Sequence, residues 1–368
     1  MDKAQISDIL KQLTSVDGLS GSEARVAELV RSLAGSTVTE FRTDALGNLI
    51  GLRRGAPEAG SESASGRIML AAHMDEIGLA VTKIDRGFLH LAKVGGVDPR
   101  SVVGQEVTVY PSGPGSAAYP DGLPGYVGSR PPHLLSADER QKVVGLADLR
   151  VDLGLPPAFF ENGLIRVGDR IALRGPVTEL LGGRLASKAL DNRVSVAVMI
   201  GALGYLDAMR HTWDVFAVAT VQEEYGLRGA KAAAFGVAPD LGIALDVTFA
   251  DTPGVSDNET FAMDKGPTIG LGPNLHPGVV RRLKAAAEAL EIPYQIEPLP
   301  GNSGTDAWAI QVTQAGIPTG LISVPVRYMH SCVETVALAD VDRAARLLAG
   351  FISRLDATSL ADIATELP

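Results

Sequence analysis

From Ser187 onward, segments with helical spacing alternate with short apolar runs, and this alternation restricts the fold more than any other feature of the chain. The predicted elements follow one another as helix 193–210, strand 214–221, helix 226–235, strand 241–245, helix 278–290, strand 294–297, helix 307–315, strand 320–324 and helix 340–355. Such an alternation is typical of a mostly parallel, mixed sheet with helices on both faces. An α/β fold is therefore expected.

The first 78 residues follow the same pattern. Residues 1–35 show helical spacing of apolar side chains, interrupted by a Gly/Ser-rich stretch at 18–22, and strands are predicted at 39–42, 49–53 and 68–72. The polar segment 55–66, GAPEAGSESASG, is predicted to be a surface loop between two of these strands.

Residues 79–180 have a different texture. Short alternating runs are separated by dense Gly and Pro, which indicates a small β-barrel or sandwich, with one weakly helical segment at 136–141. If His73 before this stretch and Asp191 after it bind the same metal, the stretch must be an insertion into a single α/β domain. We therefore predict a catalytic domain made of residues 1–78 and 181–368, and an inserted β-rich domain at 79–180.

Composition excludes several classes of protein. A formal charge of −10 without any local Lys/Arg cluster argues against nucleic-acid binding. The N-terminus lacks the basic start and apolar run of a signal peptide, and the longest apolar stretch, 194–206, is too short to span a bilayer. The single cysteine, Cys332, rules out an internal disulfide. These features predict a cytoplasmic protein that does not bind membranes.

Six residues of metal-binding type lie close to the ends of predicted elements. They are His73 in AAHMDEIG, Asp191 in KALDNR, Glu223 and Glu224 in VQEEYGLRGA, Asp246 in ALDVT, and His330 in RYMHS. Two His and four carboxylates suit borderline divalent metals, with zinc expected first and cobalt or manganese as alternatives. One carboxylate more than the metals need leaves a candidate general base, so the set is typical of a two-metal hydrolase.

Each of these residues also has a purely structural interpretation. Asp191 precedes a predicted helix and could be its N-cap, and the Glu223–Glu224 pair could simply begin a polar loop. Asp75 lies two residues after His73, so both side chains point to the same side, where a carboxylate can fix the tautomer of a metal-binding imidazole. Spacing alone does not decide which of Glu223 and Glu224 is the ligand and which the base.

Other motifs are weaker. The segment 301–307, GNSGTDA, could line a pocket, although capping of the next helix by Thr305 or Asp306 is the preferred interpretation. The chain has no GxSxG elbow, and its Gly-rich stretches lack the strand–GxGxxG–helix context, so a serine hydrolase and a nucleotide site are both disfavoured. Cys332 has no CxxC partner.

Taken in order, AAHMDEIG, SKALDNR, TVQEEYGLRGA, ALDVT, GNSGTDA and RYMHS…ETV resemble the motifs of the tetrahedral (TET-type) metallo-aminopeptidases. That family includes glutamyl aminopeptidases, deblocking aminopeptidases and members once labelled endoglucanases. The resemblance spans nearly the whole chain and includes DLRVDLG and GDRIAL in the inserted segment.

The resemblance implies a role for each site residue. Asp191 would bridge two divalent metals, with His73 and Asp246 completing one site and Glu224 and His330 the other. Glu223 would be the general base, and Asp75 would orient His73. A PDZ-like β-barrel insertion would serve dimerisation, and the dimers would assemble into hollow tetrahedral dodecamers that take up short peptides with a free N-terminus.

The expected function is therefore removal of N-terminal residues from peptides by a two-metal, bridging-water mechanism. A carboxypeptidase or an amidohydrolase on the same scaffold is the alternative, and a non-enzymatic peptide-binding scaffold is a more distant one. Glycoside hydrolysis normally uses two carboxylates without metal, so the endoglucanase label finds little support. A pocket for acidic side chains should carry Lys or Arg, and Phe249 stands where the resemblance suggests a more polar residue.

Overall fold

The computed structural model describes residues 1–58, 60, 63–256 and 259–365. Its helices are α1 (Lys3–Ser15), α2 (Ala24–Ala34), α3 (Ala137–Arg140), α4 (Leu190–Tyr205), α5 (Arg228–Val237), α6 (Pro277–Ala289), α7 (Asp306–Gln311), α8 (Leu338–Ile352) and α9 (Ser359–Ala364). Its strands are β1 (Glu40–Thr43), β2 (Leu49–Arg53), β3 (Arg67–His73), β4 (Gly78–Asp85), β5 (Phe88–Val94), β6 (Glu106–Tyr110), β7 (Leu123–Gly128), β8 (Arg150–Asp152), β9 (Arg170–Leu173), β10 (Thr178–Leu180), β11 (Arg184–Ser187), β12 (Asp214–Thr220), β13 (Leu241–Phe249), β14 (Thr268–Leu271), β15 (Gln295–Pro298), β16 (Thr319–Arg327) and β17 (Glu334–Ala337).

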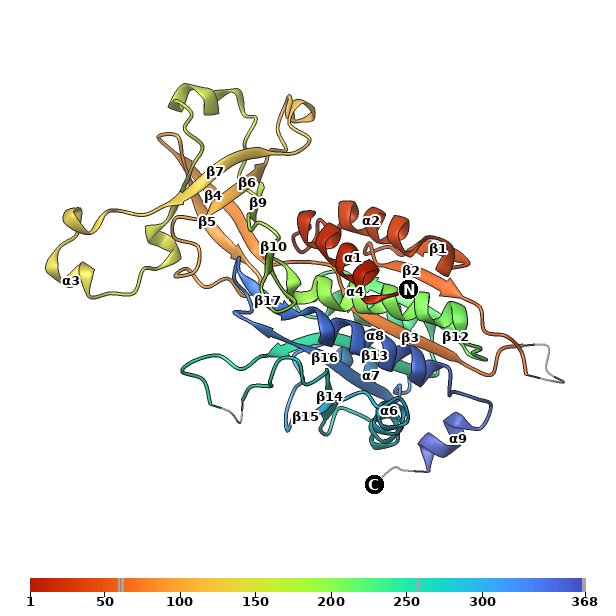
Figure 1. Ribbon diagram of the computed structural model, residues 1–368. Helices are drawn as coiled ribbons and strands as arrows, with labels where there is room; N and C mark the ends of the chain where they lie inside the picture. The colour runs from red at the N-terminus through yellow and green to blue at the C-terminus, as the bar shows by residue number, and fades with distance from the viewer. Residues whose placement is uncertain (59, 61–62, 257–258, 366–368) are drawn as a thin grey trace.

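A large mixed sheet forms the centre of the molecule (Figure 1). Its main order is β1-β2-β12-β3-β13-β16-β17-β11-β10, with β14 and β15 attached beside β16. The four middle strands β12, β3, β13 and β16 run parallel, while the strands that flank them pair antiparallel. Helices α1, α4 and α8 pack together on one side of the middle strands, and α5 and α7 cover them from the other. The predicted mixed α/β sheet is confirmed.

The middle strands are mostly apolar and are buried along most of their length, because both of their faces are covered. In β3, RIMLAAH, every residue after Arg67 is buried. Strand β16 is buried from Thr319 to Val326. Helix α4 is mostly apolar and is buried from Leu190 to Gly204, since it lies between the sheet and its neighbours α1 and α8. Continuous burial of this kind is what parallel strands under two helical layers require.

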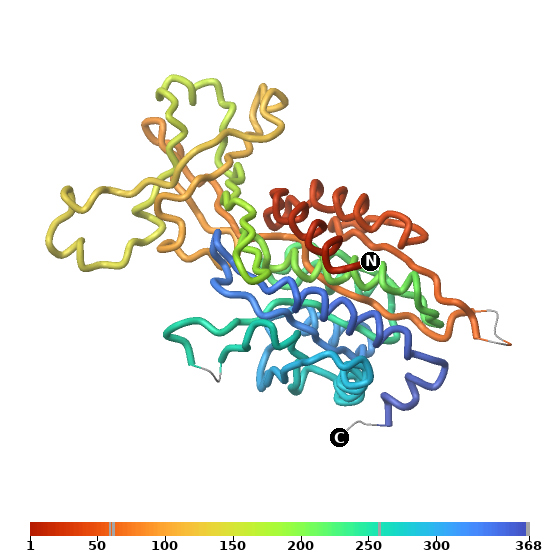
Figure 2. Tube along the Cα trace, in the orientation of Figure 1, coloured from red at the N-terminus to blue at the C-terminus, as the bar shows by residue number. Residues whose placement is uncertain are grey.

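The predicted insertion forms a separate closed barrel of strands β4-β5-β8-β7-β6-β9, which projects from the sheet (Figures 1 and 2). Its own apolar core contains Leu79, Val107, Val151 and Ile171. Strand β4 at its entry pairs with β9 at its exit, so the chain leaves and re-enters the main body at neighbouring points. The predicted helical segment at 136–141 is confirmed as α3.

Some boundaries differ from the sequence-based expectation. The prediction assigned residues up to 180 to the insertion, whereas β10 pairs with β11 in the large sheet and the last barrel strand ends at Leu173. Strand β13 continues to Phe249 because its pairing with β16 extends that far. The short strands β11, β14 and β17 were not predicted. The division into a catalytic and a dimerisation domain stays a prediction.

The predicted loop 55–66 joins β2 to β3, and residues 59 and 61–62 within it lie outside the described residues. In the part of the chain that the structure describes, no helix combines the length and the apolar character needed to cross a membrane.

Candidate metal centre

The middle strands of the sheet bring the six predicted ligand-type residues to one end. His73 is the last residue of β3, and Glu223 and Glu224 occupy the turn that follows β12. Asp246 lies inside β13, three residues before its end, rather than after the strand as predicted. Asp191 lies in the irregular first turn of α4, and His330 follows β16 in a short loop. The carboxyl ends of parallel strands are where α/β folds place their sites.

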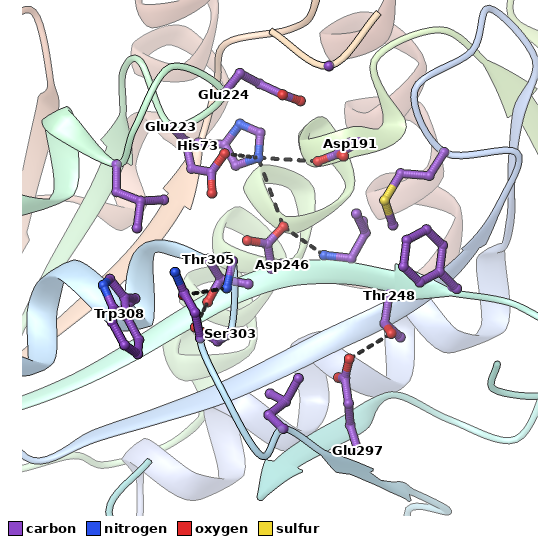
Figure 3. A pocket seen from close by; sticks show the side chains of 18 of the residues that line it. His73, Asp191, Glu223, Glu224, Asp246, Thr248, Glu297, Ser303, Thr305 and Trp308 are labelled. Carbon is purple, nitrogen blue, oxygen red and sulfur yellow. Dashed lines mark hydrogen bonds and ion pairs between the residues drawn. The ribbon is translucent and has the colours of Figure 1, made fainter. Parts of the chain in front are cut away.

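Asp191 lies between the two histidines (Figure 3 shows its contact with His73). Its Oδ1 is 3.2 Å from Nε2 of His73, and its Oδ2 is 3.2 Å from Nε2 of His330. Because its side chain is turned to the histidines, Asp191 caps no helix, and Ala189 occupies the N-cap position. A carboxylate placed in this way can bind one cation with each oxygen.

The structure contains two neighbouring groups of possible metal ligands, and Asp191 belongs to the second of them. One group contains His73, Glu223 and Asp246, and the other contains Asp191, Glu224 and His330; within each, the ligand atoms lie within 4.8 Å of one another. Glu224 approaches Nε2 of His330 to 3.3 Å, while Glu223 is 3.8 Å from Nε2 of His73.

The charges in this cluster shift the titration of its members. Hydrogen bonds to Asp191 and Glu224 raise the pKa of His330 to about 11. Burial raises the pKa of Glu223 and that of Asp246 well above their usual values. Burial also opposes ionisation of Asp191, but its hydrogen bonds to the two histidines outweigh this and lower its pKa. Repulsion between the neighbouring carboxylates also raises the pKa of Glu223 and that of Asp246, and a bound divalent cation would relieve that repulsion.

Two buried carboxylates, Asp75 and Glu334, hydrogen-bond to the backbone of the ligand-type residues. Asp75 Oδ1 accepts the backbone N–H of Glu223 at 3.0 Å, and its Oδ2 accepts that of Glu224 at 3.2 Å. Nδ1 of His73 lies 3.2 Å from the backbone oxygen of Asp75 and 3.4 Å from its carboxylate. Burial opposes ionisation of Asp75, but His73 outweighs it and lowers the pKa. Asp75 therefore contacts His73 as predicted and also fixes the Glu223–Glu224 turn.

The second supporting carboxylate, Glu334, was quoted in a sequence motif but given no role. It accepts the backbone N–H groups of Asp191 and His330. The signal that could have identified it is a single acidic residue within the apolar run CVETVA, all of which except Val333 is buried. A lone carboxylate in a buried strand requires partners of its own.

Residues 47–347 match the M42 glutamyl aminopeptidase family. The chain belongs to this family. It is 34% identical to a lysyl aminopeptidase of Pyrococcus furiosus, over 95% of this chain and 97% of that one. Among solved structures, an aminopeptidase from the archaeon Desulfurococcus kamchatkensis is 39% identical, with a TM-score of 0.87 and 98% of each chain covered. The TET1 peptidase of Pyrococcus horikoshii is 32% identical, with a TM-score of 0.80, 95% of this chain and 100% of that one covered.

The predicted relationship to TET-type aminopeptidases is thus confirmed, and the chain is an aminopeptidase of a metal-dependent family. Its donor set fits that chemistry. Imidazole and carboxylate ligands suit zinc, cobalt and manganese, and the shared position of Asp191 between two histidines suits a pair of ions. Neither group of possible ligands in the described residues contains a thiolate, and the one cysteine of the chain, Cys332, packs with the barrel core.

The centre opens into a cavity of about 1110 Å³. The predicted pocket segment takes part, because Asn302, Ser303, Gly304 and Thr305 line it (Figure 3 labels two of them). The preferred capping interpretation is correct for the position of Thr305 and wrong for the predicted side-chain cap. Thr305 is the N-cap residue of α7 but makes no side-chain cap bond, since its hydroxyl pairs with that of Ser303. Asp306 instead accepts a hydrogen bond from the hydroxyl of Thr220 at 2.6 Å.

The barrel also reaches the centre. The backbone oxygen of Gly96 lies 3.2 Å from Nδ1 of His330, on the opposite side of the ring from Asp191. A Cβ at position 96 would lie 2.4 Å from that nitrogen, so only glycine leaves room for the imidazole. The inserted segment thus helps to fix the orientation of the His330 imidazole.

Proposed function

We propose that this M42 peptidase removes N-terminal residues from short peptides with the help of two divalent cations. The observation that carries the proposal is the position of Asp191 between His73 and His330, with one further carboxylate beside each histidine. His73 and Asp246 would hold one cation, Glu224 and His330 the other, and Asp191 both. Bound cations would supply a water of lowered pKa and polarise the scissile carbonyl. Zinc is the preferred ion, with cobalt and manganese as alternatives.

Glu223 is the general base of this proposal. Its carboxylate faces the cavity, and its backbone is held by Asp75. Burial favours its neutral form, and bound cations would counteract that effect, so the group can accept and release a proton near neutral pH. In the reaction Glu223 takes a proton from the attacking water and delivers it to the leaving amine.

Self-assembly is proposed as well. The TET1 peptidase of P. horikoshii can assemble into a tetrahedron or a large octahedral shell. The barrel of this chain exposes Tyr126, Leu134 and Val143, which are between 56% and 74% exposed. Apolar side chains on a projecting barrel favour its use in dimerisation, with dodecamers built from the dimers. The cytoplasmic location and the absence of nucleic-acid and membrane partners stay predictions.

A panel of aminoacyl-p-nitroanilides tests the proposed activity. We expect no release after chelation and restored release after addition of zinc, cobalt or manganese, because the ligand cluster has no catalytic role without cations. N-acetylated peptides and C-terminally amidated peptides distinguish the alternatives: the proposal requires cleavage of the amidated and not of the acetylated form. The opposite result would identify a carboxypeptidase or an amidohydrolase on this scaffold.

The lining of the cavity predicts discrimination against acidic N-terminal residues. Away from the metal centre the described lining carries the carboxylates Glu259 and Glu297 together with apolar residues such as Phe249 and Leu299, and includes no Lys or Arg. An acidic side chain would meet like charge without a cationic partner. We expect kcat/KM for lysyl and leucyl substrates to exceed that for the glutamyl substrate by at least about tenfold.

The variant Glu297→Gln tests whether negative charge in the cavity causes the predicted discrimination against the glutamyl substrate. It removes one negative charge and keeps the size of a side chain that accepts hydrogen bonds from Thr248 and Thr268. In this variant the difference in kcat/KM between the lysyl and the glutamyl substrate should become smaller. A wild-type enzyme that prefers the glutamyl substrate would contradict the charge argument.

A further inference from the structure

Glu334, the first residue of β17, makes two hydrogen bonds of the same kind. Its Oε2 accepts the backbone N–H of Asp191 at 2.9 Å, and its Oε1 accepts the backbone N–H of His330 at 2.8 Å. The residue is 2% exposed, so water does not compete for these bonds. One carboxylate therefore joins the start of α4 to the loop after β16.

The two residues that it joins both have irregular backbone conformations. Asp191 has φ −79° and ψ 101°, outside the helical region, although it lies in the first turn of α4. His330 has a φ of +62°, in the left-handed region that side chains other than glycine rarely adopt. Neither N–H makes a regular helical or strand bond there, and Glu334 gives each one an acceptor.

Asp191 and His330 also belong to the same group of possible ligands, completed by Glu224. The other buried carboxylate, Asp75, holds the backbone of Glu223 and Glu224 and contacts His73, so it serves both groups. Among the described residues, the hydrogen bonds of Glu334 go to Asp191 and His330, and Glu334 reaches the group of His73, Glu223 and Asp246 only through Asp191, which contacts His73. Its influence is therefore concentrated on one of the two sites.

We propose that Glu334 is a positioning residue that holds Asp191 and His330 in place and thereby sets the affinity of the second cation site selectively. The consequence for metal binding rests on the proposed two-metal function, whereas the positioning itself does not. Residues that orient metal ligands from behind typically change affinity 10- to 100-fold when replaced.

The test compares Glu334→Gln with the wild type. A glutamine has the same size, but its amide offers a single oxygen, so its NH₂ group must face one of the two backbone N–H groups. Asp340→Asn is the matched control. Asp340 is fully buried and accepts the backbone N–H groups of Asp264 and Gly266 at 2.6 and 2.8 Å, and it is not part of the cavity lining.

Two measurements separate the positioning from its consequence. Hydrogen–deuterium exchange on the metal-free protein should show faster exchange in the peptides that contain Asp191 and His330 in Glu334→Gln, and not in Asp340→Asn. Calorimetric titration with Zn²⁺ should show one of two sites weakened 10- to 100-fold in Glu334→Gln, with both sites unchanged in Asp340→Asn.

Unchanged exchange at Asp191 and His330 would overturn the proposal, as would equal weakening of both Zn²⁺ sites in Glu334→Gln. A third outcome is faster amide exchange in Glu334→Gln together with fewer than two Zn²⁺ ions bound to the wild type. This outcome would support the positioning role of Glu334 and would refute the two-metal function. The failure of one proposal is thus distinguishable from the failure of the other.

Discussion

Glu223→Gln is expected to lose turnover by about 10³-fold while retaining both metal ions. Glutamine matches the shape of glutamate and keeps the same backbone bond to Asp75, but it cannot take a proton from the attacking water. The measurement pairs kcat on the preferred aminoacyl-p-nitroanilide with the metal content per chain of the same preparation.

Glu224→Gln is the matched comparison, because the two residues are adjacent and share the support of Asp75. Glu224 lies 3.3 Å from Nε2 of His330 and is assigned as a ligand, so this variant should lose metal as well as activity. If Glu223→Gln loses a metal ion and Glu224→Gln keeps both, the two assignments must be exchanged.

Asp191→Ala is expected to have the most severe effect on metal binding. The carboxylate is 3.2 Å from each histidine, so its removal takes one ligand from each site at once. We expect fewer than one ion per chain and a fall in kcat/KM of at least about 10³-fold, since the cations supply several kcal/mol of transition-state stabilisation.

Metal analysis and circular dichroism check this result together. Asp207→Ala is a suitable control, because Asp207 lies just after the far end of α4, where it is exposed and paired with Arg53. A folded Asp191→Ala protein that still binds two ions would remove the basis for a shared ligand.

Much of the centre was predictable because parallel strands deliver their ends to one edge. His73 and the Glu223–Glu224 pair follow apolar runs whose length matches β3 and β12, and in the sheet Thr220 is the register partner of His73. The sequence alone could not decide which of Glu223 and Glu224 is the base and which the ligand. The directions of two adjacent side chains in a turn depend on how the turn folds. In the structure Glu223 approaches His73 and Glu224 approaches His330, and the assignment of base and ligand stays a proposal.

Other features depend on contacts between distant segments and leave little local signal. The extent of β13 beyond Asp246 is set by its pairing with β16, so the polar residue did not end the strand as predicted. Asp306 resembles a helix-capping residue in the sequence, yet it is buried at the start of α7 and bonded to Thr220, the last residue of β12. Glu334 bonds to His330, four residues before it, and to Asp191, 143 residues before it, and no spacing pattern in the sequence records the second contact.

The place of the barrel in the chain also dictates how the protein can be made. Strand β3 has only two partners in the described sheet, β12 and β13, and both are synthesised after the barrel. The nascent chain therefore carries the apolar strand RIMLAAH without a neighbour while the ribosome completes the whole insertion. Unpaired apolar strands are sites of aggregation, so β3 is exposed to that hazard during this interval. The barrel can fold from its own antiparallel contacts during that time, and the catalytic sheet closes around β3 only afterwards.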